Sequence, residues 1–290
     1  MTKNLLNLSG KIDLKTVELF KIINQISTEL GISYVVVGAT ARDLVLHHGF
    51  GARIRRATSD IDFGIQISSW SDFKKLTDLL INHGFKETVS AQKLISSNGT
   101  MVDIVPFGAL EDEASNIQWP PNCDIVMNVQ GFQEAHDNAI EVFIQKEPPI
   151  TIPVVTSEGM ALLKIIAWSD RERNLRVKDV GDLAYLLETY ELVTEVSSRV
   201  YEEEGLMEKY DWNITLASAH LLGNDSVAIA GGATKQRIVQ ILNKNLQKNS
   251  PNLLVEEMCE HIEHDYQYKL SLLKAFSNGF KGEQSMKVNN

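Results

Sequence analysis

The stretch VVVGATARDLVLHHGFGARIRRATSDIDFGI, residues 35–65, decides the fold. It begins as a β-branched apolar run, which is typical of a buried strand, and breaks at Gly38. It ends in an alternating segment, residues 60–67, that predicts a second strand and contains Asp60 and Asp62 among apolar residues. Side chains two positions apart on a strand point to the same face, so the two carboxylates share a face of the predicted sheet.

Two carboxylates on one face of a core strand repel each other, and burying them without a partner is costly. A divalent cation resolves this conflict, because Mg²⁺ accepts hard oxygen ligands and is commonly bound by one or two carboxylates together with substrate phosphates. The segment MVDIVPF, residues 101–107, places Asp103 alone in another apolar strand. If that strand lies beside residues 60–67, the three carboxylates can hold two metal ions roughly 3.5–4 Å apart, an arrangement suited to phosphoryl or nucleotidyl transfer.

The glycine turn offers the second half of a nucleotide site. Small residues after Gly38 let the backbone approach a phosphate, and the helix that starts there has free N–H groups, to which Thr40 adds a hydroxyl. The turn matches neither GxGxxG nor the P-loop pattern, which excludes Rossmann and P-loop readings at the level of the motif.

The chain changes character near residues 150–157. Helical spacing over residues 14–30, a helix over 40–49, a helix over 69–85 and further strands up to about 155 predict an α/β half, and helical periodicity continues from there. We therefore expect domains at residues 1–155 and 156–280, followed by a frayed tail at 281–290.

Composition favours a soluble globular protein in a reducing cytoplasm. Apolar residues make up 43% of the chain and charged residues 23%, and the two cysteines lack the spacing of a metal or disulfide motif. We find no signal peptide and no apolar run of membrane-spanning length. The net charge of −10 argues against general nucleic-acid binding, but Arg53, Arg55 and Arg56 form a local basic patch that suits a small anion or RNA, or serves only as solvated surface charge.

The order of these features resembles the nucleotidyltransferase superfamily built on a polymerase-β-like palm: strand, Gly-Ala-Thr turn, helix, Asp-Ile-Asp, and a later strand with one Asp. The second turn residue, Ala39, departs from the Gly-Gly or Gly-Ser of the family pattern. The segments KIIAWSDRE and RVKDVGDLAYLL extend the resemblance to about residue 187, toward predicted nucleotidyltransferases akin to AbiEii-type toxins. The resemblance implies an α+β fold: an N-terminal palm with a mixed sheet flanked by helices, followed by an all-helical C-terminal domain.

The resemblance also implies roles for residues. Asp60, Asp62 and Asp103 would be catalytic and would bind two Mg²⁺ or Mn²⁺ ions. Candidate nucleotide-binding residues are Gly38, Ala39, Thr40, Arg42, Lys164, Lys178 and Asp179.

The activity implied is metal-dependent transfer of NMP from an NTP to a hydroxyl acceptor, with release of pyrophosphate. RNA, tRNA or a protein is the candidate acceptor, and an antitoxin protein is a candidate partner. Two alternatives stay open: a non-catalytic nucleotide-binding module, and a small-molecule nucleotidyltransferase of the aminoglycoside-modifying kind, which the acidic net charge would suit.

Overall fold

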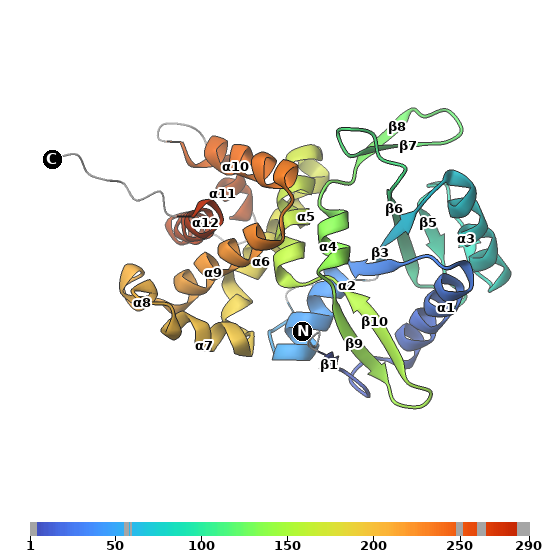
Figure 1. Cartoon of the computed structure of the whole chain (residues 1–290), viewed down its shortest axis with the longest axis horizontal. Coiled ribbons are helices and arrows are strands. Elements are labelled where there is room, and N and C mark those ends of the chain that lie inside the picture. The colour runs from blue at the N-terminus through green and yellow to red at the C-terminus, as the bar shows by residue number, and fades with distance from the viewer. Residues whose placement is uncertain (1–4, 55–57, 59, 248–251, 260–264, 283–290) are drawn as a thin grey trace. The chain divides into compact units, whose positions relative to one another are not determined.

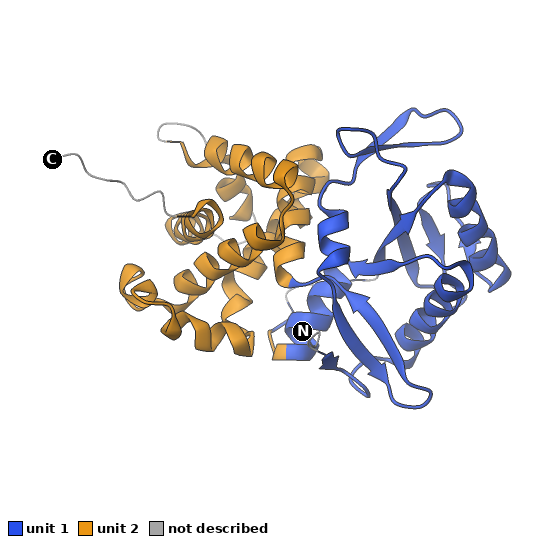
Figure 2. Cartoon of the chain, in the orientation of Figure 1, with its two compact units in different colours: residues 1–49, 53–156 blue, residues 50–52, 157–290 orange. Residues whose placement is uncertain are grey.

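The computed structural model describes residues 5–54, 58, 60–247, 252–259 and 265–282. Its backbone contacts divide the chain into two compact units, residues 1–49 with 53–156 and residues 50–52 with 157–290 (Figure 2). Within the described ranges, all strands lie in the first unit and the second unit is helical. The protein therefore has a mixed α+β architecture.

An eight-stranded mixed sheet forms the first unit (Figure 1). Its central strand β3 (Asp60–Ile67) runs antiparallel to β2 (Tyr34–Val37) and parallel to β6 (Met101–Gly108). The strand predicted over residues 60–67 is confirmed with the same bounds. The strands follow the order β1 (Leu5–Asn7), β9 (Ile140–Gln145), β10 (Ile150–Val154), β2, β3, β6, β5 (Lys93–Ile95) and β4 (Lys86–Glu87).

Alternate side chains of β3 pack on different helices. Phe63 meets Phe20 of α1 (Leu14–Leu30) edge to face, with ring centroids 6.0 Å apart. On the other face, Gly64 lies so close to α4 (Phe132–Asp137) that an added Cβ would be 2.7 Å from the Phe132 ring. The half-buried Asp60 and Asp62 share the α4 face, because they have the same parity along the strand as Gly64.

Local signals set the helix ends. The helix expected over residues 14–30 is confirmed as α1, where Asp13 accepts a hydrogen bond from the Thr16 amide and Gly31 closes the helix in the left-handed region at φ 63°. Ser69 caps α3 (Trp70–Asn82) by accepting from the Asp72 amide. The helix after the glycine turn ends at Gly49 as expected but begins two residues earlier, as α2 (Gly38–Arg42), and its second part, Asp43–Gly49, is a π-helix.

A two-stranded hairpin of β7 (Asn116–Trp119) and β8 (Ile125–Asn128) completes the first unit. It pairs outside the main sheet. Its Trp119 packs edge to face on Phe73 of α3, with ring centroids 5.4 Å apart, which anchors the hairpin to that helix.

The second unit is a helical bundle organised around α9 (Ile214–Ile229) and α12 (Tyr266–Lys281). Gly223 and Gly279 let these two helices touch through their backbones. No helix in the described residues combines the length and the apolar character needed to cross a membrane. The remaining elements are α5 (Ser157–Asp170), α6 (Arg173–Thr189), a 3₁₀ turn (Tyr190–Leu192), α7 (Thr194–Glu202), α8 (Leu206–Lys209), α10 (Gly232–Leu246) and α11 (Leu253–Met258).

Candidate active site

The sheet register brings two of the predicted carboxylates together. In the parallel β3–β6 pair, Asp62 is the direct partner of Asp103, and Asp60 is the partner of Met101. Neighbouring strands lie about 4.8 Å apart, and in-register side chains of such a pair leave the sheet on the same face. Asp62 and Asp103 are therefore side-by-side neighbours, and Asp60 lies one pleat earlier on that face.

The glycine turn lies beside Asp62 as well, on the side of β3 where β2 is paired. β2 ends at Val37, which pairs with Asp62 in the antiparallel β2–β3 ladder, so Gly38 follows directly beside this aspartate. Gly38 has φ +71°, and a Cβ built on it would lie 1.9 Å from Asp62 Oδ2. The Asp62 carboxylate thus occupies the space that only a glycine leaves open at this turn.

Two other turn residues hold the frame of this site. The Thr40 hydroxyl donates to the Asp60 carbonyl at 2.9 Å, which ties the first turn of α2 to the start of β3. Arg42 is 2% exposed, and its Nε and Nη2 atoms donate to Asp43 Oδ1 at 2.9 and 2.7 Å. The guanidinium of Arg42 is thus engaged inside the fold, and its predicted contact with a phosphate stays a prediction.

Lys93 is a neighbour of the site that the sequence reasoning missed. It pairs with Asp103 across the antiparallel β5–β6 ladder, and its Nζ lies 3.4 Å from Asp103 Oδ2. The Asn98-Gly99 pair predicts a hairpin, but a two-residue turn there would set Leu94 opposite Asp103. In the structure Ser96 pairs with Thr100 around a three-residue loop, and this shifts the register so that Lys93 lies opposite Asp103. Lys93 supplies a positive charge beside two adjacent carboxylates.

The donor set suits a hard divalent cation in its chemistry. Asp60, Asp62 and Asp103 offer carboxylate oxygens on one face of adjacent strands, and oxygen is the ligand that Mg²⁺ prefers. As the side chains stand, the described residues contain no group of three or more His, Cys, Asp or Glu placed to hold a metal ion. The strand register therefore fits a metal site in its chemistry, although the three carboxylates are not placed around one ion as their side chains stand.

The remaining candidates lie in the second unit. Lys164 of α5 bridges two buried carboxylates of α6, with its Nζ 3.0 Å from Asp179 Oδ1 and 2.8 Å from Asp182 Oδ2. Burial opposes the charge of the Lys164 ammonium, but Asp182 and Asp179 outweigh it and raise its pKa above the ordinary value. Lys164 therefore stays protonated and joins α5 to α6.

Two further residues complete this cluster, and one predicted residue lies outside it. Arg171 Nη1 donates to Asp179 Oδ2 at 2.8 Å, so Asp179 is held by two cations. Arg171 and Asp182 were both missed, although helical spacing from Asp179 to Asp182 puts the two carboxylates on neighbouring positions of one face. Lys178, predicted to bind nucleotide, is exposed on α6.

Of the three arginines in the predicted basic patch, the structure describes one. Arg53 is exposed and belongs to the first unit. Arg55 and Arg56 lie outside the described residues.

Comparison with known proteins places the chain in a family. No curated protein matches the sequence. Two solved structures are similar at low identity. The first is the antibiotic-resistance factor ANT(2'')-Ia in solution, at 15% identity, covering 69% of this chain and 98% of that one with a TM-score of 0.35. The second is a tRNA-processing enzyme in an apo form, at 12% identity, covering 94% and 91% with a TM-score of 0.27.

The comparison with protein-family models identifies the family of this chain. The model of the "nucleotidyl transferase AbiEii toxin, type IV TA system" family matches residues 26–226, a span that includes Gly38, all three aspartates and the Lys164 cluster. The chain therefore belongs to the AbiEii family of toxin–antitoxin systems and is a nucleotidyltransferase.

Proposed function

We propose that this nucleotidyltransferase moves NMP from an NTP to a hydroxyl acceptor in a reaction that depends on a divalent metal. The observation that carries the proposal is the pairing of Asp62 with Asp103 in register, with Gly38 pressed against Asp62. Three carboxylates beside a glycine turn are the groups needed for metal-assisted nucleotidyl transfer. In this proposal the first unit is the polymerase-β-like palm and the second is the helical domain.

Asp60, Asp62 and Asp103 would hold Mg²⁺ or Mn²⁺. When bound, the metal would offset the negative charge of the triphosphate and polarise the phosphoryl group that is attacked. The acceptor oxygen forms a bond to the α-phosphorus, the bond from that phosphorus to the bridging oxygen breaks, and pyrophosphate leaves. Asp103 would take the proton of the acceptor hydroxyl.

The turn at Gly38, Ala39 and Thr40 would orient the triphosphate through its backbone N–H groups. Thr40 contributes mainly by holding the start of β3, because its hydroxyl is engaged with the Asp60 carbonyl. Lys164, Lys178 and Asp179, which belong to the second unit, are also proposed to bind nucleotide. For Lys164 and Asp179 this requires exchange of part of their mutual ion pair for ligand contacts.

RNA, with tRNA foremost, is the proposed acceptor, and the exposed Arg53 with the neighbouring arginines is the charge that would meet its phosphates. The family description pairs such a toxin with an antitoxin, which makes an antitoxin protein the expected partner. We propose that the protein acts in the cytoplasm, where both NTPs and tRNA are present.

The test compares wild type, Asp62→Asn and the matched control Asp78→Asn, which changes an exposed carboxylate on α3. Each protein is incubated with Mg²⁺ and each of the four NTPs, labelled at the α- or the γ-phosphate, with tRNA, total RNA or protein as acceptor. We expect α-label transfer by wild type and the control, its loss on EDTA addition, and a loss of at least about 100-fold in Asp62→Asn.

Three outcomes would contradict the proposal. Transfer of the γ-label without the α-label would mean phosphoryl transfer instead. Equal activity of Asp62→Asn and wild type would remove the aspartates from the reaction. NTP binding without any label transfer would favour the non-catalytic nucleotide-binding module.

A further inference from the structure

Lys93 ends a row of residues that crosses the sheet at the candidate active site. Asp62 pairs with Val37 of β2 on one side and with Asp103 of β6 on the other. Asp103 in turn pairs with Lys93 of β5. Paired residues on neighbouring strands direct their side chains to the same face, and the strands lie about 4.8 Å apart. The row therefore has the turn of Gly38, which follows Val37, at one end, the Lys93 ammonium at the other end and two carboxylates between them.

The ammonium group of Lys93 is held loosely. Its Nζ lies 3.4 Å from Asp103 Oδ2, whereas a charge-assisted hydrogen bond from nitrogen to oxygen is about 2.7–2.9 Å long. The side chain of Lys93 is 37% exposed and that of Asp103 is 20% exposed, and an ion pair open to water contributes little to stability. A metal ion bound by Asp103 would offset the charge of this carboxylate and repel the ammonium group. Lys93 can therefore exchange Asp103 for another anion at little cost.

The edge of the sheet beyond Lys93 is positive on the same face. Ile95 has the same parity along β5 as Lys93, and its partner on β4 is Lys86, which is exposed. The acidic neighbour Glu87 pairs with Leu94, so it belongs to the opposite face. On the face that carries the carboxylates, β4 and β5 therefore contribute two cations and no anion.

Nucleotidyl transfer requires a fixed direction of approach. The attacking oxygen and the leaving oxygen lie roughly in line through the phosphorus. With the triphosphate at the turn of Gly38, pyrophosphate leaves on the β2 side of the carboxylates. The acceptor hydroxyl then approaches from the β5 side, beside Asp103. The part of the acceptor that adjoins this hydroxyl is the part of the substrate closest to Lys93.

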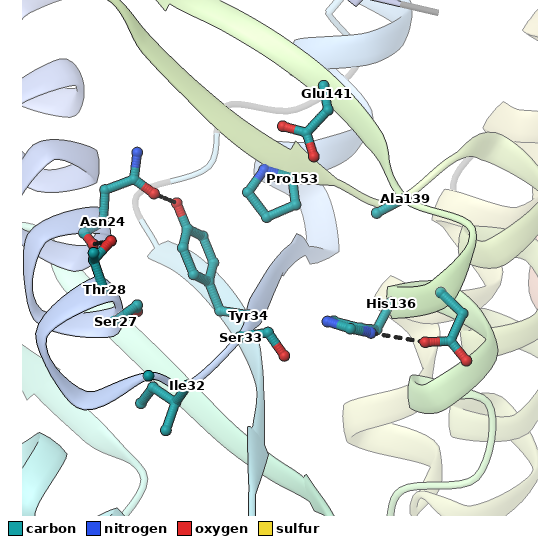
Figure 3. A pocket seen from close by; sticks show the side chains of 12 residues that line it. Asn24, Ser27, Thr28, Ile32, Ser33, Tyr34, His136, Ala139, Glu141 and Pro153 are labelled. Atoms are coloured by element: carbon teal, nitrogen blue, oxygen red, sulfur yellow. Dashed lines mark hydrogen bonds and ion pairs between the residues drawn. The ribbon is translucent and has the colours of Figure 1, made fainter. Parts of the chain in front are cut away.

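A hollow elsewhere in the first unit does not suit an anionic acceptor (Figure 3). Its volume is about 650 Å³, and it lies beside Tyr34 at the start of β2. None of its twelve lining residues is Lys or Arg, and Asp137 and Glu141 contribute negative charge. This hollow would repel phosphates, in contrast to the sheet edge that carries Lys86 and Lys93.

We propose that Lys93 binds the acceptor phosphate next to the hydroxyl that reacts, and that Lys86 binds a further phosphate of the same chain. The inference rests on the proposed function and specifies its acceptor: a nucleic acid, there RNA, and not a cationic small molecule. Lysine suits this role because its ammonium group is a compact point charge on a flexible stem, which can move from a carboxylate to a phosphate.

The experiment measures binding of fluorescently labelled total tRNA to the full chain by anisotropy, with Mg²⁺, without NTP and over a series of salt concentrations. The variants are Lys93→Met, Lys93→Arg, Lys86→Met and the control Lys74→Met, which changes an exposed lysine of α3. Lys93→Met should reduce the steepness of log K against log salt by about 0.7–0.9, the value of one phosphate contact, and weaken binding about five- to eightfold at 0.1 M salt. Lys86→Met should have an effect of the same kind and no larger. Lys93→Arg and Lys74→Met should keep the slope of wild type.

Steady-state transfer of the α-label separates the two substrates. Lys93→Met should raise KM for tRNA by the factor seen in binding and change KM for NTP by less than about twofold. A residue with a merely structural role would change neither the salt slope nor the KM for tRNA selectively.

Contrary results would overturn the proposal in different ways. A wild-type salt slope in Lys93→Met would remove the phosphate contact, and a raised KM for NTP instead of tRNA would assign Lys93 to the triphosphate. An effect in Lys86→Met alone would mean that the edge binds RNA without orienting it at the carboxylates. Wild-type binding of tRNA too weak to measure would exclude an RNA acceptor at this edge. If wild type transfers no label from any NTP, the proposed function fails, whereas the salt slopes still test the contact of Lys93 with RNA.

Discussion

Replacing Gly38 by alanine tests the contact on which the candidate site is built. At φ +71°, an alanine pays about 1–2 kcal/mol for the left-handed backbone conformation. Its Cβ would also lie 1.9 Å from Asp62 Oδ2 and 2.7 Å from Asp62 Cγ, so this carboxylate must rotate away, at about 0.5–1.5 kcal/mol if it leaves its preferred rotamer. The total expected destabilisation is about 1.5–3.5 kcal/mol.

Gly99→Ala is the matched control. Gly99 has φ +87°, and no atom lies within 4 Å of a Cβ built there, so this variant shows the backbone cost without the clash. Urea unfolding followed by circular dichroism should find Gly38→Ala less stable than Gly99→Ala by about 1 kcal/mol. In an Asp62→Ala background most of that difference should disappear, because only the Cβ of residue 62, 3.0 Å away, remains close.

The same variants report on function through metal affinity. A displaced Asp62 carboxylate should weaken Mn²⁺ binding, measured by calorimetry, on the order of tenfold in Gly38→Ala and not at all in Gly99→Ala. The reasoning is refuted if both variants lose equal stability, if the double-mutant cycle shows no coupling with Asp62, and if Mn²⁺ affinity is the same in both.

Three other expectations follow from contacts in the two units. Gly279→Ala would set a Cβ 2.0 Å from the backbone oxygen of His220 and should lower the free energy of unfolding by about 1–3 kcal/mol or more. Gly181→Ala, where the space around the new Cβ in α6 is open, should raise the free energy of unfolding by about 0.5–1 kcal/mol. Urea unfolding would contradict this reasoning if both changes had the same sign. Lys93→Met removes the cation beside Asp103, so calorimetry should show tighter Mn²⁺ binding. The free energy of unfolding of the metal-free protein should fall by less than about 1 kcal/mol. An unchanged Mn²⁺ affinity would count against the placement of the metal. Glu257→Ala removes a buried carboxylate that accepts from the half-buried Arg176 and from the Trp168 indole, and should cost about 3–5 kcal/mol by the same unfolding assay. A loss under about 1 kcal/mol would contradict the importance of this ion pair.

The elements with strong local signals were predictable from the sequence. α1 has helical spacing between an Asp cap and a left-handed glycine, and its bounds agree with the expected helix over residues 14–30. The β7–β8 hairpin had no such signal, because its strands have four residues each and the Trp119-Pro-Pro segment between them interrupts any alternation. Its position depends on Trp119 packing against α3, and a tertiary contact of this kind leaves no periodic trace in the chain.

In the candidate site, too, features set by local periodicity were predictable and features set by strand register were not. That Asp60 and Asp62 share a face follows from the two-residue period of a strand, and Asp103 in a second apolar strand was a reasonable third member. Which residue of β6 meets Asp62 depends on the register of a parallel pair, and register is set by the packing of the whole sheet. Lys93 was not predictable in this way, because the β5–β6 register depends on a three-residue loop that the Asn98-Gly99 pair does not specify.

The contact between Gly38 and Asp62 gives the glycine a structural reason that sequence reasoning did not supply. From the sequence, the glycine was expected to let a phosphate approach the backbone. In the structure, the Asp62 carboxylate already fills the space above Gly38, because β2 and β3 are antiparallel and Val37 pairs with Asp62. The glycine is therefore required before any ligand arrives, to let a metal-ligand candidate lie against the turn. A nucleotide phosphate near this turn would then lie beside that carboxylate, which is the position where a bridging divalent cation is most needed.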